Sequence, residues 1–240
     1  MVITTIFIIV IALIAALIPA IIWFILFSRK DIHPEPRRLL VYTFNFGVMI
    51  SLAVLIFQVF YQNIIDMPTK SLISIVGLAL IEEVLKFLSA FWAIHKNPEF
   101  DEPIDAMIYA MAAALGFATV ENFFIILNIP NITEFITVSP VIFKIVSLRF
   151  IGATLLHVLA SAIVGFFWAY GRKKNKIVKP IIIGLIIATA VHSIFNLLIY
   201  EFQNTNLWYP ALFLVIVVFF VLIDFKKLKY EKNFNKKPCG

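Results

Sequence analysis

Residues 2–27 read VITTIFIIVIALIAALIPAIIWFILF, without a single charged side chain. An α-helix needs about 20 consecutive apolar residues to cross the ~30 Å hydrocarbon core of a bilayer. This stretch therefore predicts a membrane-spanning helix. No basic segment precedes it and no small-residue cleavage motif follows it, so we interpret it as a retained helix and not as a signal peptide.

The composition of the whole chain extends this interpretation. Of the 240 residues, 62% are hydrophobic and 14% are charged, whereas a soluble domain has about 45–50% and about 25%. So few charges cannot cover a water-facing surface, which excludes a soluble enzyme, a secreted domain and a disordered chain. The one cysteine, Cys239, excludes a disulfide framework and a cysteine-based zinc site. The sequence predicts an all-α, polytopic membrane helix bundle.

Seven apolar runs are long enough to span a bilayer. They are Ile3–Phe27, Leu39–Tyr61, Ser71–His95, Ile104–Ile129, Val141–Tyr170, Lys179–Tyr200 and Leu207–Phe225. No internal repeat and no separable soluble domain interrupts them. We therefore expect about seven transmembrane helices in a single domain, residues 1–225, followed by a basic cytoplasmic tail, residues 226–240.

The basic residues are unevenly distributed between the loops. Sixteen of the 20 follow the first, third and fifth runs or lie in the tail, whereas the opposite loops hold only Lys70. Cytoplasmic loops are enriched in Lys and Arg, so we expect the N-terminus outside and the C-terminus in the cytoplasm of a cell-membrane protein. The net charge of +6 is thus a topology signal, with anionic lipid contact as a secondary role. It does not indicate nucleic-acid binding.

Several ionisable and amide side chains lie inside these apolar runs. A charge at the bilayer centre costs roughly 2.5–3.5 kcal/mol on insertion scales, so such residues are usually paired or face an aqueous cavity. The set comprises Glu82, Glu83, Lys86, Glu121, Asn122, Arg149, His157, His192 and Asn196. Counting residues along the runs puts the two adjacent glutamates and both histidines in one layer, with Glu121 nearer the outer surface.

The two histidines fall on helix faces made of small residues. One face holds Gly184, Ala188, His192 and Asn196, and the other holds Ala153, His157, Ser161 and Gly165. Positions four apart stack on one side of a helix, and small residues let membrane helices approach closely. Both histidines are therefore expected to point into the bundle.

The two adjacent glutamates suggest acid–base chemistry. Lys86 is four residues from Glu82 and three from Glu83, within ion-pair reach of either. Two neighbouring carboxylates at low dielectric are not expected to be both ionised without compensation, and a general base needs such an environment. The spacing leaves open which glutamate is the base, because the two point about 100° apart on the helix.

Each of these features alone also has a structural explanation. A single Glu–Lys pair can be a packing device, and a lone histidine can bridge two helices. Asp101-Glu102-Pro103 reads first as a helix start, with an acidic cap and proline at the first helical position. A structural role does not explain so many polar groups on four neighbouring helices, and their joint occurrence predicts a functional site.

Five motifs follow one another along the chain. They are Glu82-Glu83-x-x-Lys86, Phe100-Asp101-Glu102-Pro103-x-Asp105, Gly116-Phe117-Ala118-x-x-Glu121-Asn122, Arg149 followed by His157, and His192-Ser193-x-Phe195-Asn196. In this order they resemble the motifs of the PrsW family of intramembrane proteases. The resemblance covers about Leu78 to Leu197. It also links the chain to the CAAX prenyl endopeptidases and bacteriocin-processing proteases, which are glutamic intramembrane proteases. Prenyl endopeptidases carry E-E-x-x-x-R, so the shorter spacing to Lys86 argues against prenylated substrates.

The resemblance implies hydrolysis of peptide bonds in membrane-anchored proteins, such as site-one cleavage of an anti-sigma factor on the extracytoplasmic side. By motif, Glu82 and His157 would hold and activate the water, and Glu83 with Lys86 would orient that base. His192 and Asn196 would form an oxyanion site. The supporting groups would be Glu121, Asn122 and Arg149.

Three other functions could use the same residues. A zinc protease could bind its ion through Glu82 or Glu83, His157 and His192, although no H-E-x-x-H motif is present. A proton-coupled transporter also uses intramembrane Glu and His chains, but the chain lacks paired, broken repeats. A binding protein could keep the scaffold without chemistry. We expect an enzyme that needs no cofactor and acts on a membrane-anchored protein.

Overall fold

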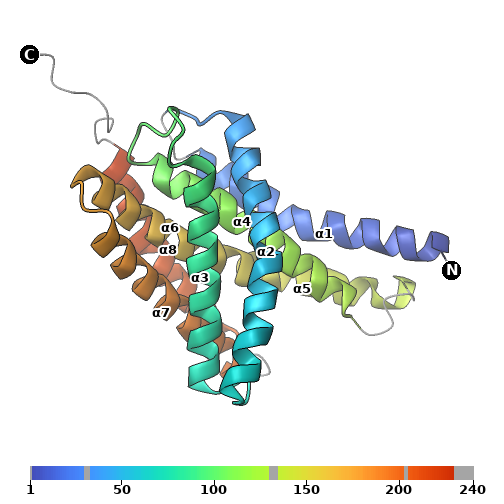
Figure 1. The fold of residues 1–240 in the computed structure, drawn as a ribbon. Helices are drawn as coiled ribbons and strands as arrows, with labels where there is room; N and C mark the ends of the chain where they lie inside the picture. Colours follow the sequence, from blue (N-terminus) through green and yellow to red (C-terminus); the bar gives the residue numbers. More distant parts are fainter. Residues whose placement is uncertain (1, 30–32, 130–134, 203–204, 230–240) are drawn as a thin grey trace, which may run out of the picture.

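The computed structural model describes residues 2–29, 33–129, 135–202 and 205–229. Over these residues the chain forms eight α-helices and contains no strand (Figure 1). The helices are α1 (Val2–Ser28), α2 (Arg37–Ile65), α3 (Leu72–Ile94), α4 (Asp105–Leu127), α5 (Phe135–Ile151), α6 (Ala153–Lys173), α7 (Val178–Phe202) and α8 (Trp208–Lys229). The predicted all-α bundle is confirmed.

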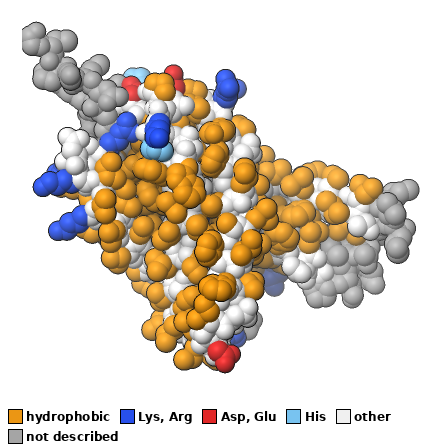
Figure 2. All heavy atoms as spheres, in the orientation of Figure 1, with side chains coloured by type: hydrophobic (Ala, Val, Ile, Leu, Met, Phe, Trp, Pro, Cys, Tyr) orange, Lys and Arg blue, Asp and Glu red, His pale blue; other side chains and the backbone are white. Residues whose placement is uncertain are grey.

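Most of these helices are apolar enough to cross a membrane. Within the described residues, six segments of 22 to 32 residues qualify by length and composition. The helix outside this set, α3, carries Glu82, Glu83 and Lys86. The space-filling view shows an almost continuous hydrophobic face, with most of its visible Lys and Arg side chains along the upper left edge (Figure 2). The chain is a multi-pass integral membrane protein, and its orientation across the membrane stays a prediction.

One predicted helix, Val141–Tyr170, is wrong as a single element. The chain breaks at Gly152 into α5 and α6, where Gly152 has φ −98° and ψ −95°. Glycine reaches such backbone angles at little steric cost because it has no Cβ. The break was hidden because residues on both sides of it are apolar and no proline marks it. Together α5 and α6 contribute one of the six candidate spans, Ile142–Lys173.

The remaining predicted runs agree with the observed helices to within four residues. At the C-terminal end, α8 continues to Lys229, so the predicted tail begins as helix. The rest of that predicted tail, residues 230–240, lies outside the described residues. The first span, α1, begins at Val2 and ends at Ser28.

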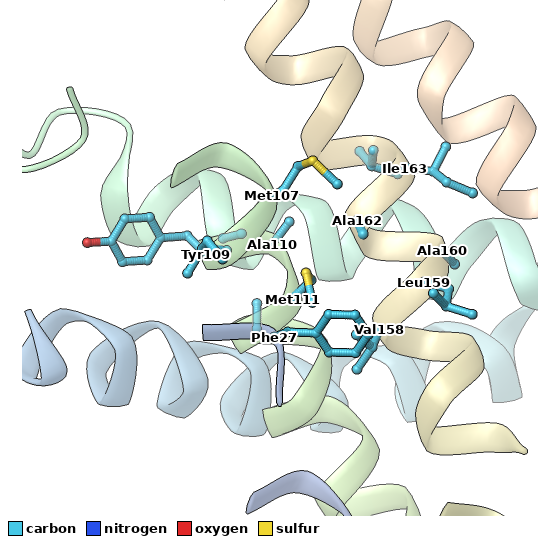
Figure 3. Close-up of a cluster of buried hydrophobic side chains, with 14 of the residues drawn as sticks. Phe27, Met107, Tyr109, Ala110, Met111, Val158, Leu159, Ala160, Ala162 and Ile163 are labelled. Atoms are coloured by element: carbon cyan, nitrogen blue, oxygen red, sulfur yellow. The ribbon is translucent and has the colours of Figure 1, made fainter. Parts of the chain in front are cut away.

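Helix α4 is the central element, and small residues explain its position. A Cβ at Gly47 of α2 would lie 1.9 Å from the Ala113 carbonyl oxygen. A Cβ at Gly116 of α4 would lie 2.0 Å from the Phe44 carbonyl oxygen. The backbones of α2 and α4 are therefore in direct contact, as small residues allow in membrane helices. On another side, α4 packs on α6, and the buried side chains of both helices interdigitate (Figure 3). This packing fixes where α4 and α6 present their polar residues.

The loop before α4 corrects a second expectation. Helix α4 begins at Asp105 and not at Pro103. The Asp105 carboxylate reaches back and accepts hydrogen bonds from the backbone N–H groups of Asp101 and Glu102, at 3.0 and 2.7 Å. Phe100 is fully buried in this loop. The acidic motif therefore closes a turn at the end of the bundle, away from the polar cluster described next.

Candidate active site

Five helices bring most of the predicted polar side chains into one cluster. Helix α3 contributes Glu82, Glu83 and Lys86, α4 contributes Glu121 and Asn122, α5 contributes Arg149, α6 contributes His157, and α7 contributes His192. These residues are separated by up to 110 positions in the sequence. Their convergence is therefore a property of the fold and not of one local motif.

A fully buried ion pair lies in the middle of the cluster. Lys86 Nζ is 2.6 Å from Glu83 Oε1, and both side chains have 0% exposure. The two residues are three apart on α3, so they share one face of the helix. The same carboxylate oxygen lies 2.7 Å from Nδ1 of His192, which donates to it. Glu83 thus compensates the lysine charge and ties α3 to α7.

His157 is held from both sides of its ring. Lys86 Nζ lies 3.1 Å from Nδ1, and Glu121 Oε2 lies 2.7 Å from Nε2. An ammonium group only donates hydrogen bonds, so Nδ1 accepts and Nε2 carries the hydrogen, an assignment inferred from the partners. The ring of Phe117 contacts the imidazole edge to face, with centroids 5.1 Å apart. These contacts fix both the ring orientation and the tautomer of His157.

A second ion pair connects the cluster to its more open side. Arg149 Nη2 lies 2.9 Å from Glu121 Oε2. Arg149 Nε donates to the amide oxygen of Asn122, whose Nδ2 donates to Thr154 Oγ1 at 3.1 Å. The Glu121 side chain is 36% exposed and that of Arg149 is 17% exposed, in contrast to the buried Glu83–Lys86 pair. The cluster is therefore accessible from the side of Glu121.

Glu82 has one bonded and one unbonded carboxylate oxygen. Gln58 of α2 donates from Nε2 to Glu82 Oε1 at 2.8 Å. The other oxygen, Oε2, is buried and forms no hydrogen bond with a described residue. It lies 3.7 Å from His192 Nε2 and 4.0 Å from His157 Nδ1. These distances exceed direct hydrogen bonds.

Three acceptor atoms consequently face one another. Because His192 donates from Nδ1 to Glu83, a neutral His192 presents Nε2 as an acceptor towards Glu82. The third acceptor is His157 Nδ1, which Lys86 already satisfies. Among the described residues, Glu82, His157 and His192 are the group whose potential ligand atoms all lie within 4.8 Å of one another. The two free acceptors in this group, Glu82 Oε2 and His192 Nε2, can receive two hydrogens from one donor molecule, and the three residue types are also those found in metal sites.

Two predicted residues differ from the rest in their surroundings. Glu121, expected nearer the outer surface, contacts His157 directly, and its depth in the membrane stays a prediction. Helix α4, which carries it, crosses α2 and α3 at a steep angle in the view of Figure 1. Asn196 follows His192 by one helical turn, is half-buried, and its side chain forms no hydrogen bond with a described residue. It lies outside the network that joins the other predicted residues.

Gln58 is a contact residue that the sequence analysis missed. It lies in the second apolar run, which has no charged residue between Arg38 and Asp66 to draw attention. Its side chain is half-buried and anchors Glu82 from α2. The available signal was a lone glutamine within a membrane-spanning run, because an amide inside a bilayer also needs a partner.

Comparisons with known proteins agree with the resemblance seen in the motifs. Residues 35–223 match a family model described as PrsW family intramembrane metalloprotease. The chain is 26% identical over 231 residues to Protease PrsW of Clostridioides difficile (strain 630), covering 92% of each chain. It is 23% identical over 218 residues to Protease PrsW of Bacillus subtilis (strain 168), covering 90% of this chain and 94% of that protein. No solved structure shows a significant match.

Proposed function

This chain belongs to the PrsW family of intramembrane proteases, and we propose that it cleaves membrane-anchored proteins with a water molecule activated by Glu82. The observation that carries the proposal is the unbonded, buried oxygen of Glu82, 3.7 Å from His192 Nε2. Two acceptors that share one tetrahedral water lie roughly 4–5 Å apart when each is ~2.8 Å from it. The observed 3.7 Å is shorter than this, so the two side chains separate by about 0.5–1 Å when they receive both hydrogens of one water.

The chemistry then follows from the acceptors. Glu82 Oε2 removes one proton from the water as the oxygen attacks the carbonyl carbon of the scissile peptide bond. The carbonyl becomes a tetrahedral oxyanion. When this intermediate collapses, the C–N bond breaks and the proton on Glu82 passes to the leaving nitrogen. The products are a carboxylic acid and an amine, and the enzyme is regenerated.

The other residues act on this pair of acceptors. Gln58 orients the Glu82 carboxylate by bonding its second oxygen, and Glu83 fixes the tautomer of His192 by accepting from Nδ1. This assignment differs from the expectation based on the motifs, because His192, and not His157, shares the water with Glu82. Asn196 keeps its expected role as the oxyanion donor, since its free amide lies one turn beyond His192, and such a donor contributes about 10²–10³-fold to kcat.

His157 is a positioning residue in this proposal. It accepts from Lys86 and donates to Glu121, so it joins the buried ion pair to the accessible side of the cluster. Arg149 and Asn122 extend that connection to α5. The exposure of Glu121 supports substrate entry past this carboxylate.

The substrate class follows from where the site lies. Glu82 is at the eleventh position of the 23-residue helix α3, so the scissile bond must reach the middle of the helix bundle. A protein anchored by a transmembrane segment meets this requirement, and a regulatory membrane protein cleaved at its first site is the substrate type we propose. The sequence spacing to Lys86 argues against a prenylated substrate.

The family description raises a metal-dependent alternative. Glu82, His157 and His192 are suitable zinc ligands. The ring nitrogen of each histidine that faces away from Glu82 donates its hydrogen to a carboxylate, as in many metal-binding histidines. Yet the His157 nitrogen that faces Glu82 already accepts from the Lys86 ammonium, which is itself a cation. A metal ion does not fit this arrangement, because Lys86 uses the lone pair that the ion would need and would repel it.

A reconstituted cleavage assay separates the two candidates. The protein in lipid nanodiscs is mixed with a library of single-pass membrane peptides, and the products are identified by mass spectrometry with and without a chelator. We expect discrete products that the chelator leaves unchanged. Loss of products with chelator, restored by added zinc, would replace the proposal with the metal-dependent alternative. Products that persist when both Glu82 and Glu83 are changed to Gln would reject both.

A further inference from the structure

A groove of about 1000 Å³ opens between the start of α2 and the end of α3, apart from the catalytic cluster. Its walls are mostly apolar or aromatic, including Leu39, Val41, Tyr42, Trp92, Ala93 and Pro98. The aromatic side chains are not buried by protein, since Tyr42 is 48% exposed and Trp92 is 55% exposed. Trp92 is ten residues beyond Glu82 on α3, or about 15 Å along the helix. The groove is therefore a separate feature.

Two unpaired cations line this groove. Arg38, at the second position of α2, and Lys96, two residues after α3, form no ion pair or hydrogen bond with any residue in the described part of the chain. The amide of Asn45 lies on the same wall without a described partner. One carboxylate, Glu99, also lines the groove. An apolar cleft with unpaired cations at its mouth complements a ligand that has a negative head and an apolar body.

The groove lies where a phospholipid headgroup would reach it. Arg172 of α6 donates to the Phe100 carbonyl oxygen in the loop that follows Lys96. Lys227 of α8 lies over the ring of Phe166, also on α6. Arg38 and Lys96 are therefore at the end of the bundle that also holds Arg172 and Lys227. Tryptophan and tyrosine are enriched at the membrane–water interface, which agrees with the depth of the aromatic wall. Basic pockets between membrane helices bind anionic lipid headgroups.

We propose that this α2–α3 groove binds one anionic phospholipid, with the headgroup phosphate between Arg38 and Lys96 and an acyl chain along the aromatic wall. The continuous apolar wall favours a lipid over a free phosphate ion, which would contact only the mouth. Asn45 lies seven residues, or about 10 Å, further along α2 than Arg38, where it can donate to an ester carbonyl of the lipid. The proposal is independent of proteolysis.

Lipid affinity tests the proposal directly. The purified protein in neutral detergent is titrated with dioctanoyl phosphatidylglycerol and dioctanoyl phosphatidylcholine, and bound lipid is counted by native mass spectrometry. We expect the wild type to bind the anionic lipid at least about 10-fold more tightly. Each cation near a lipid surface contributes about 5-fold, so the double variant Arg38→Gln/Lys96→Gln should bind phosphatidylglycerol about 30-fold more weakly. Equal affinity of the wild type for the two lipids would overturn the proposal.

Matched variants separate a built site from a general surface charge. Lys176→Gln/Lys226→Gln removes the same charge from exposed positions at the same end of the bundle, outside the groove, and should change affinity by less than about 3-fold. Glu99→Gln should instead tighten binding by up to about 5-fold. An equal loss in both double variants would overturn the proposal.

Single variants and a competition with inorganic phosphate test the proposal further. If the Arg38→Gln/Lys96→Gln variant does not fold, each single variant should still weaken phosphatidylglycerol binding by about 5-fold, and unchanged affinity in both would reject it. Inorganic phosphate at the same concentration as the lipid should not displace it. Full displacement would show that the acyl chain contributes nothing and that the ligand is a free phosphate ion.

Discussion

The buried Glu83–Lys86 pair gives the sharpest prediction for stability. Changing Lys86 to Met removes the cation from a pair with 0% exposure and a 2.6 Å contact. It leaves Glu83 buried without its main compensating charge, and it leaves His157 Nδ1 without its donor. Breaking a buried pair on one side typically costs about 3–5 kcal/mol, so Lys86→Met should lose that much free energy of unfolding.

Removing both charges should cost much less than the sum of the single changes. The double variant Glu83→Gln/Lys86→Met leaves no uncompensated charge in the interior, so we expect a cost below about 2 kcal/mol. A matched control exists on α8, where Lys227 and Asp224 form another pair three residues apart, at 3.1 Å, with Lys227 58% exposed. Lys227→Met should cost less than about 1 kcal/mol.

The assay is reversible unfolding by denaturing detergent in mixed micelles, followed by circular dichroism, for the wild type, both Glu83 and Lys86 single variants, their double variant and the control. We expect strong coupling between Glu83 and Lys86 and only a small loss of stability in Lys227→Met. This expectation would be refuted if Lys86→Met were as mild as Lys227→Met, or if the two single costs in the buried pair simply added.

Three further predictions concern the cluster and its support. Gln58→Ala should lower kcat about 10- to 100-fold, because a hydrogen bond to a charged group is lost, while KM changes little. Gln58→Glu should not restore kcat. Wild-type kinetics in Gln58→Ala would contradict the orienting role. Asn196→Ala should lower kcat about 10²-fold with unchanged unfolding, and an unchanged kcat would remove it from the oxyanion site. Gly116→Ala should destabilise the fold by about 1–3 kcal/mol, because its Cβ would lie 2.0 Å from a backbone oxygen. Gly77→Ala should cost less, because its Cβ would meet only the Tyr61 side chain, which can move. Unfolding of the two variants measures the difference.

The apolar runs predicted the fold class because burial in lipid dominates this sequence. Six of the seven predicted runs coincide with single helices. The break at Gly152 escaped prediction because an apolar run contains no signal for where a helix changes direction. Such a break depends on contacts with other helices, including the ring of Phe195, 3.4 Å from a Cβ built at Gly152.

The sequence predicted most residues of the candidate site but not the contacts between them. Charged and amide side chains are rare inside a bilayer because burying them there costs free energy, so most residues of the cluster stood out in the sequence. Which glutamate binds Lys86 depends on the rotation of α3 against α7, which the sequence leaves open. The structure pairs Lys86 with Glu83, at 2.6 Å. Among the described residues, each glutamate keeps one unbonded oxygen, and that of Glu82 lies 3.7 Å from His192 Nε2. The partner on α2, Gln58, required the crossing of α2 and α3 to be known.

The most direct test of Glu82 as the general base is the single variant Glu82→Gln in the cleavage assay. The change keeps the size of the side chain and the hydrogen bond to Gln58 can re-form, but the amide cannot accept a proton. We expect kcat/KM to fall by at least about 10²–10⁴-fold with unchanged unfolding, and the exposed control Glu201→Gln to match the wild type. Cleavage by Glu82→Gln within about 10-fold of the wild type would contradict the account, since another group would then activate the water.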